Sequence, residues 1–143
     1  MERSLVLIKP DAVERRLIGQ IIAIYESKGL KIVALKMIQP SREIAENHYR
    51  EHQDKPFFQD LVTFFTRGKV CALIFEGDHV IETVRKINGA TDPAEAEMGT
   101  IRGRFATSKS ENIVHASDSA TSAEREIKIW FADFCQKEEI TNI

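Results

Sequence analysis

The sequence predicts an α+β fold in which a four-stranded antiparallel sheet is covered by helices on one face. Four short apolar runs, at residues 4–9, 31–38, 70–75 and 112–114, have the composition of strands. Amphipathic stretches separate them. The resulting order β-α-β-α-α-β-α-loop-β-α contains the split βαβ arrangement of the ferredoxin-like fold, with a long loop insertion before the last strand. The fold alone indicates no function.

Prolines and glycines mark the ends of the predicted strands. Pro10 stops the first run and leaves Lys9 at its end, Pro40 ends the second, and Gly77 follows the third. His115 comes directly after the fourth run. Two chemically useful side chains are therefore expected at strand ends.

Helix signals lie between the predicted strands. Apolar residues at 17, 21, 22 and 25 predict a helix that Gly29 closes, and Ser41 is a candidate N-cap for a short helix reaching residue 49. Pro56 opens a third helix with an apolar stripe at residues 58, 61, 62 and 65. Asp78 is the expected N-cap of a fourth, which ends before Gly89.

The last helix is expected to begin at Thr121 or Ser122, because Thr121 and Glu124 have the spacing of a capping box. Its buried face would hold residues 127, 130, 131 and 134. Residues 88–110 predict an irregular stretch, and one of that length is usually functional. The polar tail after Lys137 is expected to be loose.

Length and composition predict one domain spanning residues 1–143, with 43% hydrophobic and 29% charged residues. The apolar runs are far shorter than the roughly 18 residues of a membrane span, and residues 1–4 lack the layout of a secretory signal. The net charge of −2 provides no global field for nucleic acid or an anionic membrane, so any anion site must be local. Cys71 and Cys135 are expected to be packed thiols in a reducing cytoplasm.

His115 is the most informative residue of the chain. An apolar pair precedes it and small polar residues follow, which is typical of a short buried strand that presents one side chain at the edge of a fold. Glu126, early in the last helix, can return a carboxylate to the same place. A histidine with a carboxylate partner can be a nucleophile, a base or a metal ligand, and a lone histidine there can also simply be packed.

Cationic side chains are placed where they can converge on a phosphate group. Lys9 ends a buried strand, Arg85 lies near a helix end, and Arg102 and Arg104 lie in the long irregular stretch with Thr91. Taken singly, each of these cations is more often solvated than in contact with a ligand. Neither the P-loop pattern nor the dinucleotide glycine fingerprint is present.

Phe57, at the start of a helix, has two possible roles. It could be a stacking platform for a flat ligand. Its helical spacing with Leu61 and Phe64 favours core packing at least as much.

Several collinear segments together resemble the nucleoside diphosphate kinase family over nearly the whole chain. The segment at residues 112–119 (NIVHASDS) resembles the active-site motif of that family. Further matching segments are residues 8–12 (IKPDA), 56–58 (PFF), 89–93 (GATDP), 99–103 (GTIRG) and 122–127 (SAEREI). Collinear segments at the expected separations are more specific than any one motif.

The resemblance implies ping-pong transfer of a γ-phosphoryl group from a nucleoside triphosphate such as ATP to a nucleoside diphosphate. His115 would be the nucleophile, attacking through Nδ1, and Glu126, through Ser117, would orient its ring. The family pattern assigns further residues to the nucleotide. Those expected at the phosphates are Lys9, Tyr49, Arg85, Thr91 and Arg102; those expected at the base are Phe57 and Leu61; those expected at the sugar are Lys9 and Asn112.

The family also implies Mg²⁺ and self-association. The ion would arrive on the nucleotide phosphates without a dedicated protein cage. Members form homo-oligomers, tetramers or hexamers, and no membrane or nucleic-acid partner is required. The implied role is to maintain nucleoside triphosphate pools.

Some positions depart from the usual family pattern. Glycine is common at Ala116, asparagine at Asp92, proline at Met98, an acidic residue at Arg104 and an apolar residue at Lys109. None is in the presumed catalytic set, and Arg104 could add positive charge near the phosphates.

Two functions other than a kinase make different predictions for the sequence. An inactive nucleotide-binding or scaffold protein on the same fold predicts loss of His115 or of the cationic set, and all of these positions are filled. An RNA-binding ferredoxin-like module predicts a basic, aromatic sheet motif that the sequence lacks.

Overall fold

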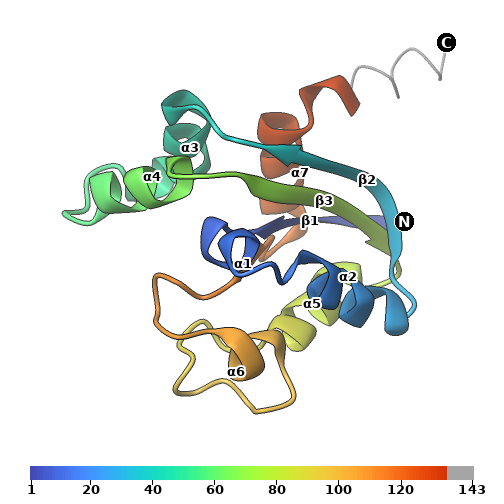
Figure 1. Cartoon of the computed structure of the whole chain (residues 1–143). Helices are drawn as coiled ribbons and strands as arrows, with labels where there is room; N and C mark the ends of the chain where they lie inside the picture. The colour runs from blue at the N-terminus through green and yellow to red at the C-terminus, as the bar shows by residue number, and fades with distance from the viewer. Residues whose placement is uncertain (135–143) are drawn as a thin grey trace, which may run out of the picture.

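The computed structural model describes residues 1–134, and the predictions for Cys135 and the tail after Lys137 lie outside these residues. One four-stranded antiparallel sheet, in the order β2-β3-β1-β4, forms the centre of the molecule (Figure 1). The strands are β1 (Glu2–Ile8), β2 (Lys31–Ile38), β3 (Val70–Gly77) and β4 (Val114–Ala116). The helices are α1 (Pro10–Glu14), α2 (Ile18–Ser27), α3 (Arg42–His48), α4 (Phe58–Thr66), α5 (Val80–Asn88), α6 (Ile101–Phe105) and α7 (Ala120–Trp130), with a 3-10 turn at Arg50–His52.

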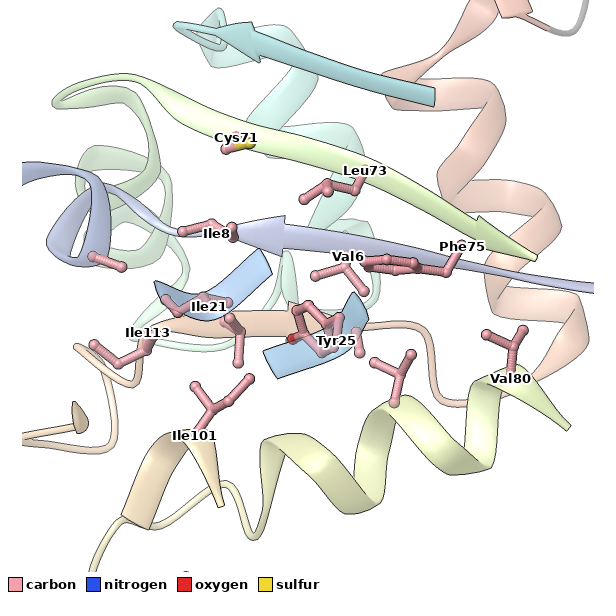
Figure 2. Packing of buried hydrophobic residues seen from close by; sticks show 14 of the residues in the cluster. Val6, Ile8, Ile21, Tyr25, Cys71, Leu73, Phe75, Val80, Ile101 and Ile113 are labelled. Carbon is pink, nitrogen blue, oxygen red and sulfur yellow. The ribbon is translucent and has the colours of Figure 1, made fainter. Parts of the chain in front are cut away.

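Helices cover both faces of the sheet, so the prediction of a single covered face is wrong. Val6 and Ile8 of β1 pack with α2 and α5 on one face, as Figure 2 shows, while Leu5 and Leu7 pack with α4 and α7 on the other. All four side chains are fully buried. An uninterrupted apolar run is what a strand covered on both faces requires, whereas a half-exposed strand alternates.

Strand β4 begins two residues later than predicted because Ile113 forms a tight turn. Its φ is 76°, and the Val114 N–H donates to the Asn112 carbonyl at 2.8 Å, which is the pattern of a γ-turn. The Ile113 carbonyl accepts from the Lys9 N–H at 2.8 Å, and the Ile113 N–H donates to Asp11 Oδ2 at 3.1 Å. A left-handed conformation is strained for a β-branched residue, so these bonds hold a turn that the sequence disfavours.

Other helix boundaries differ locally from the predictions. Ser41 caps α3 by accepting from the Ile44 N–H, as predicted, but α7 is capped by Ser119 rather than by Thr121 or Ser122. His79 rather than Asp78 is the N-cap residue of α5. Helix α1 lies where the sequence predicts only a turn that begins at Asp11.

The stretch predicted to be irregular contains α6, which Thr100 caps through its hydroxyl. Gly29 and Gly89 follow their helices with φ values of 85° and 84°, as the C-terminal signals predict. Within residues 1–134, no helix is both long and apolar enough to cross a membrane.

Gly103 allows α6 to pack closely against the preceding segment, and replacing it by alanine is expected to destabilise the fold by at least about 2 kcal/mol. An added Cβ would lie 1.9 Å from the Glu97 carbonyl oxygen, which belongs to rigid backbone. Urea unfolding measures the effect. Gly19→Ala is the matched control, because a Cβ there meets nothing within 4 Å, and it should stabilise α2 by about 0.5 kcal/mol. Equal unfolding midpoints for Gly103→Ala and the unmodified chain would contradict this packing argument.

Candidate active site

A cavity of about 360 Å³ opens where β1 and β4 meet α7 and the segment after α5. It brings together most of the residues that the sequence singled out. Those lining it are Lys9, Tyr49, Leu61, Arg85, Thr91, Arg102, Asn112, His115 and Glu126. Neither Ser117 nor Phe57 lines the cavity. Ser117 is fully buried.

The γ-turn and β4 together aim the His115 ring at this cavity. Val114 and Ala116 point into the core, so His115 between them faces the opposite side of the strand. Its side chain is 25% exposed. The side chain is therefore anchored in strand β4, and part of the imidazole ring is accessible from the cavity.

Glu126 forms a hydrogen bond with Nε2 of His115. Its Oε2 lies 2.9 Å from His115 Nε2, and its Oε1 accepts from the Ser117 hydroxyl at 2.7 Å. The carboxylate only accepts, so the proton of a neutral His115 ring lies on Nε2 and the lone pair on Nδ1. Within residues 1–134, Nδ1 makes no hydrogen bond, so it is the nitrogen free to react.

Ser117 completes this support from the sheet. Its Oγ also accepts from the Leu5 N–H at 3.0 Å, which ties the carboxylate to the central strand. Glu126 thus contacts His115 directly, whereas the family resemblance implies a contact through Ser117. The serine instead braces the far oxygen of the carboxylate.

His48 is a second imidazole beside His115. The two rings meet edge to face, with centroids 4.5 Å apart, and His48 is 3% exposed. Burial, followed by the charges of His115 and Arg125, keeps the pKa of His48 well below its ordinary value. Sequence reasoning missed this residue, since nothing in residues 47–49 separates a site histidine from a packed one.

His48, His115 and Glu126 offer ligand atoms within 4.8 Å of one another, a set that could hold a metal ion. The Trp130 indole N–H, however, donates to Nδ1 of His48 at 3.1 Å. A neutral His48 then carries its proton on Nε2 and has no free lone pair. Coordination would require the loss of that bond, so the hydrogen bonding favours a support role for His48 over a metal ligand.

Lys9 is a buried cation at the end of β1. Its Nζ donates to Asn112 Oδ1 at 2.6 Å, and the side chain is 8% exposed. Burial, and then repulsion by Arg102, lowers the pKa of Lys9 to about 8. An anion arriving beside it would restore the charge that burial disfavours.

Arg102 supports the backbone as well as lining the cavity. Its three guanidinium nitrogens donate to the carbonyl oxygens of Asn112, Gly89 and Val114 at 3.3, 2.7 and 2.7 Å. The side chain therefore fixes both ends of the γ-turn and the loop after α5. Sequence reasoning predicted only an anion contact for it.

Tyr49 and Leu61 line the cavity on the side of α3 and α4. Burial raises the pKa of Tyr49.

Phe57 is 45% exposed, and its ring lies 5.8 Å from that of His52, which does line the cavity. The alternative that Phe57 packs in the core is therefore wrong, and the half-exposed ring lies between His52 and the ammonium group of Lys55.

The departures from the family pattern lie mostly away from the reacting residues. Arg104 stacks on Phe105 at 4.8 Å and is outside the cavity lining, so it does not supply the extra charge considered above. Lys109 lines the cavity and approaches Asp92 at 3.6 Å. Met98 is 81% exposed. Ala116 is buried and lines the cavity next to His115.

A larger hollow of about 830 Å³ lies along α5 and the segment after it. It shares Arg85 and Asp118 with the smaller cavity but includes neither His115 nor Lys9. The concentration of reactive and cationic groups, rather than size, identifies the smaller cavity as the candidate active site.

The chain is similar in sequence to known proteins over most of its length. The family model described as nucleoside diphosphate kinase matches residues 2–135. The chain is 60% identical over 131 residues to a nucleoside diphosphate kinase of Clostridium perfringens, covering 92% of each chain. It is 55% identical over 140 residues to one of Methanothermobacter thermautotrophicus, covering 96% of this chain and 93% of that one.

A solved structure leads to the same family. The crystal structure of nucleoside diphosphate kinase from Encephalitozoon cuniculi is similar with a TM-score of 0.90 at 44% identity, over 92% of this chain and 89% of that chain. The shared sequence, fold and extent show that this chain is an enzyme of the nucleoside diphosphate kinase family.

Proposed function

We propose that the chain transfers a γ-phosphoryl group from a nucleoside triphosphate to a nucleoside diphosphate in two half-reactions through His115. The observation that carries the proposal is the pairing of His115 Nε2 with Glu126 at 2.9 Å, which leaves Nδ1 facing a cavity lined by cations. A scaffold protein would not need a nucleophile oriented in this way. The role in maintaining nucleoside triphosphate pools follows from the same exchange.

In the first half-reaction, the Nδ1 lone pair of His115 forms a bond to the γ-phosphorus. The bond from that phosphorus to the bridging oxygen breaks, and the nucleoside diphosphate leaves. In the second, a terminal phosphate oxygen of another diphosphate attacks the phosphorus, the N–P bond breaks, and a new triphosphate leaves. The proton remains on Nε2, donated in a hydrogen bond to Glu126, in both half-reactions, so no proton has to be moved.

Cationic and hydroxyl side chains around His115 stabilise charge on the transferring group. Lys9, Arg85 and Arg102 converge on the cavity from three segments, with Thr91 and Tyr49 as hydroxyl donors. Positioning and charge stabilisation supply most of the catalysis in phosphoryl transfer. Asn112 and Lys9 are joined by their 2.6 Å hydrogen bond, which suits the proposed contact with the sugar hydroxyls.

The lining fits a Mg²⁺ ion carried by the nucleotide better than one held by a protein cage. Glu126 is occupied by His115 and Ser117. Hydrogen bonds from Ser122 and Ser119 lower the pKa of Asp118, whose carboxylate is therefore occupied at the start of α7. When bound, Mg²⁺ would offset phosphate charge. The exposed Phe57 ring suits stacking on any base, with Leu61 beside the cavity.

A labelled phosphoenzyme tests this proposal. The protein is incubated with γ-labelled ATP and Mg²⁺, and the free nucleotide is removed. An acid-labile, base-stable phosphoprotein is expected, and adding GDP should discharge it as labelled GTP. Labelled GTP formed only while ATP and GDP are present together would instead indicate direct transfer without an enzyme intermediate.

Lys9 is expected to make nucleotide binding depend on pH. Its pKa of about 8 in the free protein means that it loses its charge as the pH rises through 8, so the affinity for ADP should fall between pH 7.5 and 9.5. Calorimetry across that range measures the loss. Lys9→Met should bind more weakly at pH 7 and show a flatter pH dependence. Parallel pH profiles for both proteins would contradict the assignment.

The burial of Lys9 also makes stability depend on pH. ADP affinity should fall as the pH rises, whereas the free energy of unfolding should increase. An unfolded Lys9 retains its proton up to about pH 10, so the unfolded chain binds more protons between pH 8 and 10.5. The contribution of Lys9 to stability therefore rises across that window in the free protein.

A second copy of the chain is the proposed occupant of the β2 edge. Leu35 and Met37 are 50% and 43% exposed, and they flank the unpaired edge of the sheet opposite Leu73 and Cys71. An exposed apolar edge strand is typical of an interface, and a two-fold axis lets the same surface serve both copies. Tetramers and hexamers can both be built from such a dimer.

Leu35→Glu is expected to dissociate this dimer, because it buries like charges across the two-fold axis. Light scattering coupled to gel filtration at micromolar concentration measures the mass. Lys128→Glu, at an exposed position on α7, is the control and should leave the mass unchanged. An assembly unaffected by Leu35→Glu would show that the copies meet elsewhere.

The cytoplasm is the proposed location. The supporting observation is that Cys71 is a free, buried thiol whose pKa burial raises to about 11, which is compatible with a reducing compartment.

A further inference from the structure

His48 and Trp130 form a buried pair behind the nucleophile. Trp130, from α7, is 1% exposed and donates its indole N–H to Nδ1 of His48 at 3.1 Å. His48, at the end of α3, lies with its ring 4.5 Å from that of His115 at an interplanar angle of 81°. The Trp130 and His48 rings are 5.6 Å apart. The three side chains thus follow one another edge to face from the core to the cavity.

The backbone at His48 is fixed by the same helix that holds His115. Arg125 of α7 donates to the carbonyl oxygens of Asn47 and His48 at 3.1 and 3.3 Å. The next residue, Glu126, holds His115. Two consecutive residues of α7 therefore hold the backbone of His48 and the ring of His115.

The indole also determines the chemical state of His48. An indole nitrogen only donates, so Nδ1 of His48 must supply a lone pair and the single ring proton must lie on Nε2. Adding a second proton at Nδ1 would place two donors against each other at 3.1 Å. Trp130 therefore holds His48 uncharged and in one tautomer.

The charged groups around His48 mostly act in the same direction. Desolvation is the largest cause of its lowered pKa, and His115, Arg125, Lys9 and His52 add repulsion. The opposing group is the Glu126 carboxylate, which lies within 4.8 Å and would attract a charged His48. A protonated His48 would compete with His115 for that carboxylate. The Nε2–Glu126 contact, on which the orientation of His115 depends, would then weaken.

We propose that Trp130 and His48 are positioning residues for His115: the indole holds His48 as a neutral imidazole, and that ring supports the nucleophile in the orientation that pairs Nε2 with Glu126. This inference rests on the proposed function and deepens it. The pair contacts no reacting atom and acts through His115. Its consequence is that phosphoryl transfer is preserved on the acid side of neutrality, where a free histidine would gain charge.

Trp130→Phe tests the proposal by removing the N–H while keeping an aromatic ring. His48 can then be protonated, and the acid limb of the kcat profile should move up by about one pH unit, with roughly a tenfold loss at pH 6. KM for the nucleotide should change less than about twofold, because the cavity is untouched. The rate of phosphoenzyme formation from ATP should follow kcat.

The double variant Trp130→Phe, His48→Gln separates charge from packing. Glutamine cannot titrate, so the acid limb should return to the position found in the unmodified protein. Ile127→Val, a truncation on the same helix and in the same core, is the packing control and should leave the limb in place. An acid limb that stays shifted in the double variant, or that does not move in Trp130→Phe, would overturn the proposal.

Nitrogen-15 NMR of the unmodified protein provides a readout independent of turnover and of variant stability. His48 should show a protonated Nε2 and an unprotonated Nδ1 from pH 5.5 to 9. A His48 that titrates in this range, or that carries its proton on Nδ1, would overturn the inference while leaving the phosphohistidine mechanism standing. Loss of the phosphoenzyme in the unmodified protein, with His48 as described, would reject the mechanism instead.

Discussion

Replacing His115 by alanine is expected to lower kcat/KM for phosphoryl transfer by at least about 10⁴-fold. In the proposed mechanism the imidazole supplies the protein atom that bonds covalently to phosphorus, and alanine cannot take over that step. Water in the vacated space could support slow nucleotide hydrolysis, but no label would remain on the protein. The measurement is steady-state transfer from ATP to GDP together with capture of the labelled phosphoenzyme.

Nucleotide affinity provides the control for His115→Ala. Lys9, Arg85 and Thr91 remain in place around the cavity, so the Kd for ADP should stay within about threefold of that of the unmodified chain. A fully active His115→Ala protein would reject the covalent mechanism. An inactive protein that has also lost ADP binding would indicate a collapsed site rather than a missing nucleophile.

Glu126→Ala is expected to reduce kcat by about 10²-fold while leaving nucleotide affinity nearly unchanged. The carboxylate accepts from both His115 Nε2 and the Ser117 hydroxyl, and its loss frees the ring to turn and to exchange tautomers. A second effect adds to the first, because the buried Ser117 hydroxyl loses its acceptor. Phosphoenzyme formation measured in a rapid-quench experiment isolates the step concerned.

Two further substitutions define what Glu126 contributes. Glu126→Gln should be less damaging, since its amide oxygen can still accept one of the two hydrogen bonds. Glu124→Ala, two residues earlier and exposed beside Lys128, is the matched control and should leave kcat unchanged. If Glu126→Ala and Glu124→Ala had the same rate, the carboxylate would have no part in orienting His115.

The sequence predicted the strands well because their apolar runs are short and sharply bounded. It placed β4 two residues early, since nothing in an isoleucine indicates a left-handed turn. That conformation depends on Asp11 and on the backbone of Lys9, more than one hundred residues away. The second layer of helices was missed although the continuous run of β1 implies two covered faces.

The candidate site was predictable where its residues lie close together in the chain. His115, Ser117 and Glu126 lie on consecutive elements, and the structure brings them into hydrogen-bonding distance. The Trp130–His48 contact spans 82 positions and depends on how α3 packs against α7. Its two members also match the patterns of ordinary core residues, so no local signal distinguishes them.

The pairing of the first strand with the last has a consequence for synthesis of the protein. Leu5 meets Ser117 across a separation of 112 residues, and Glu126 lies further along still. In a chain growing on the ribosome, β1 therefore cannot pair with β4 until the residues of β4 have emerged. On the proposed mechanism, a product truncated before Glu126 lacks the carboxylate that orients His115 and should not accept phosphate.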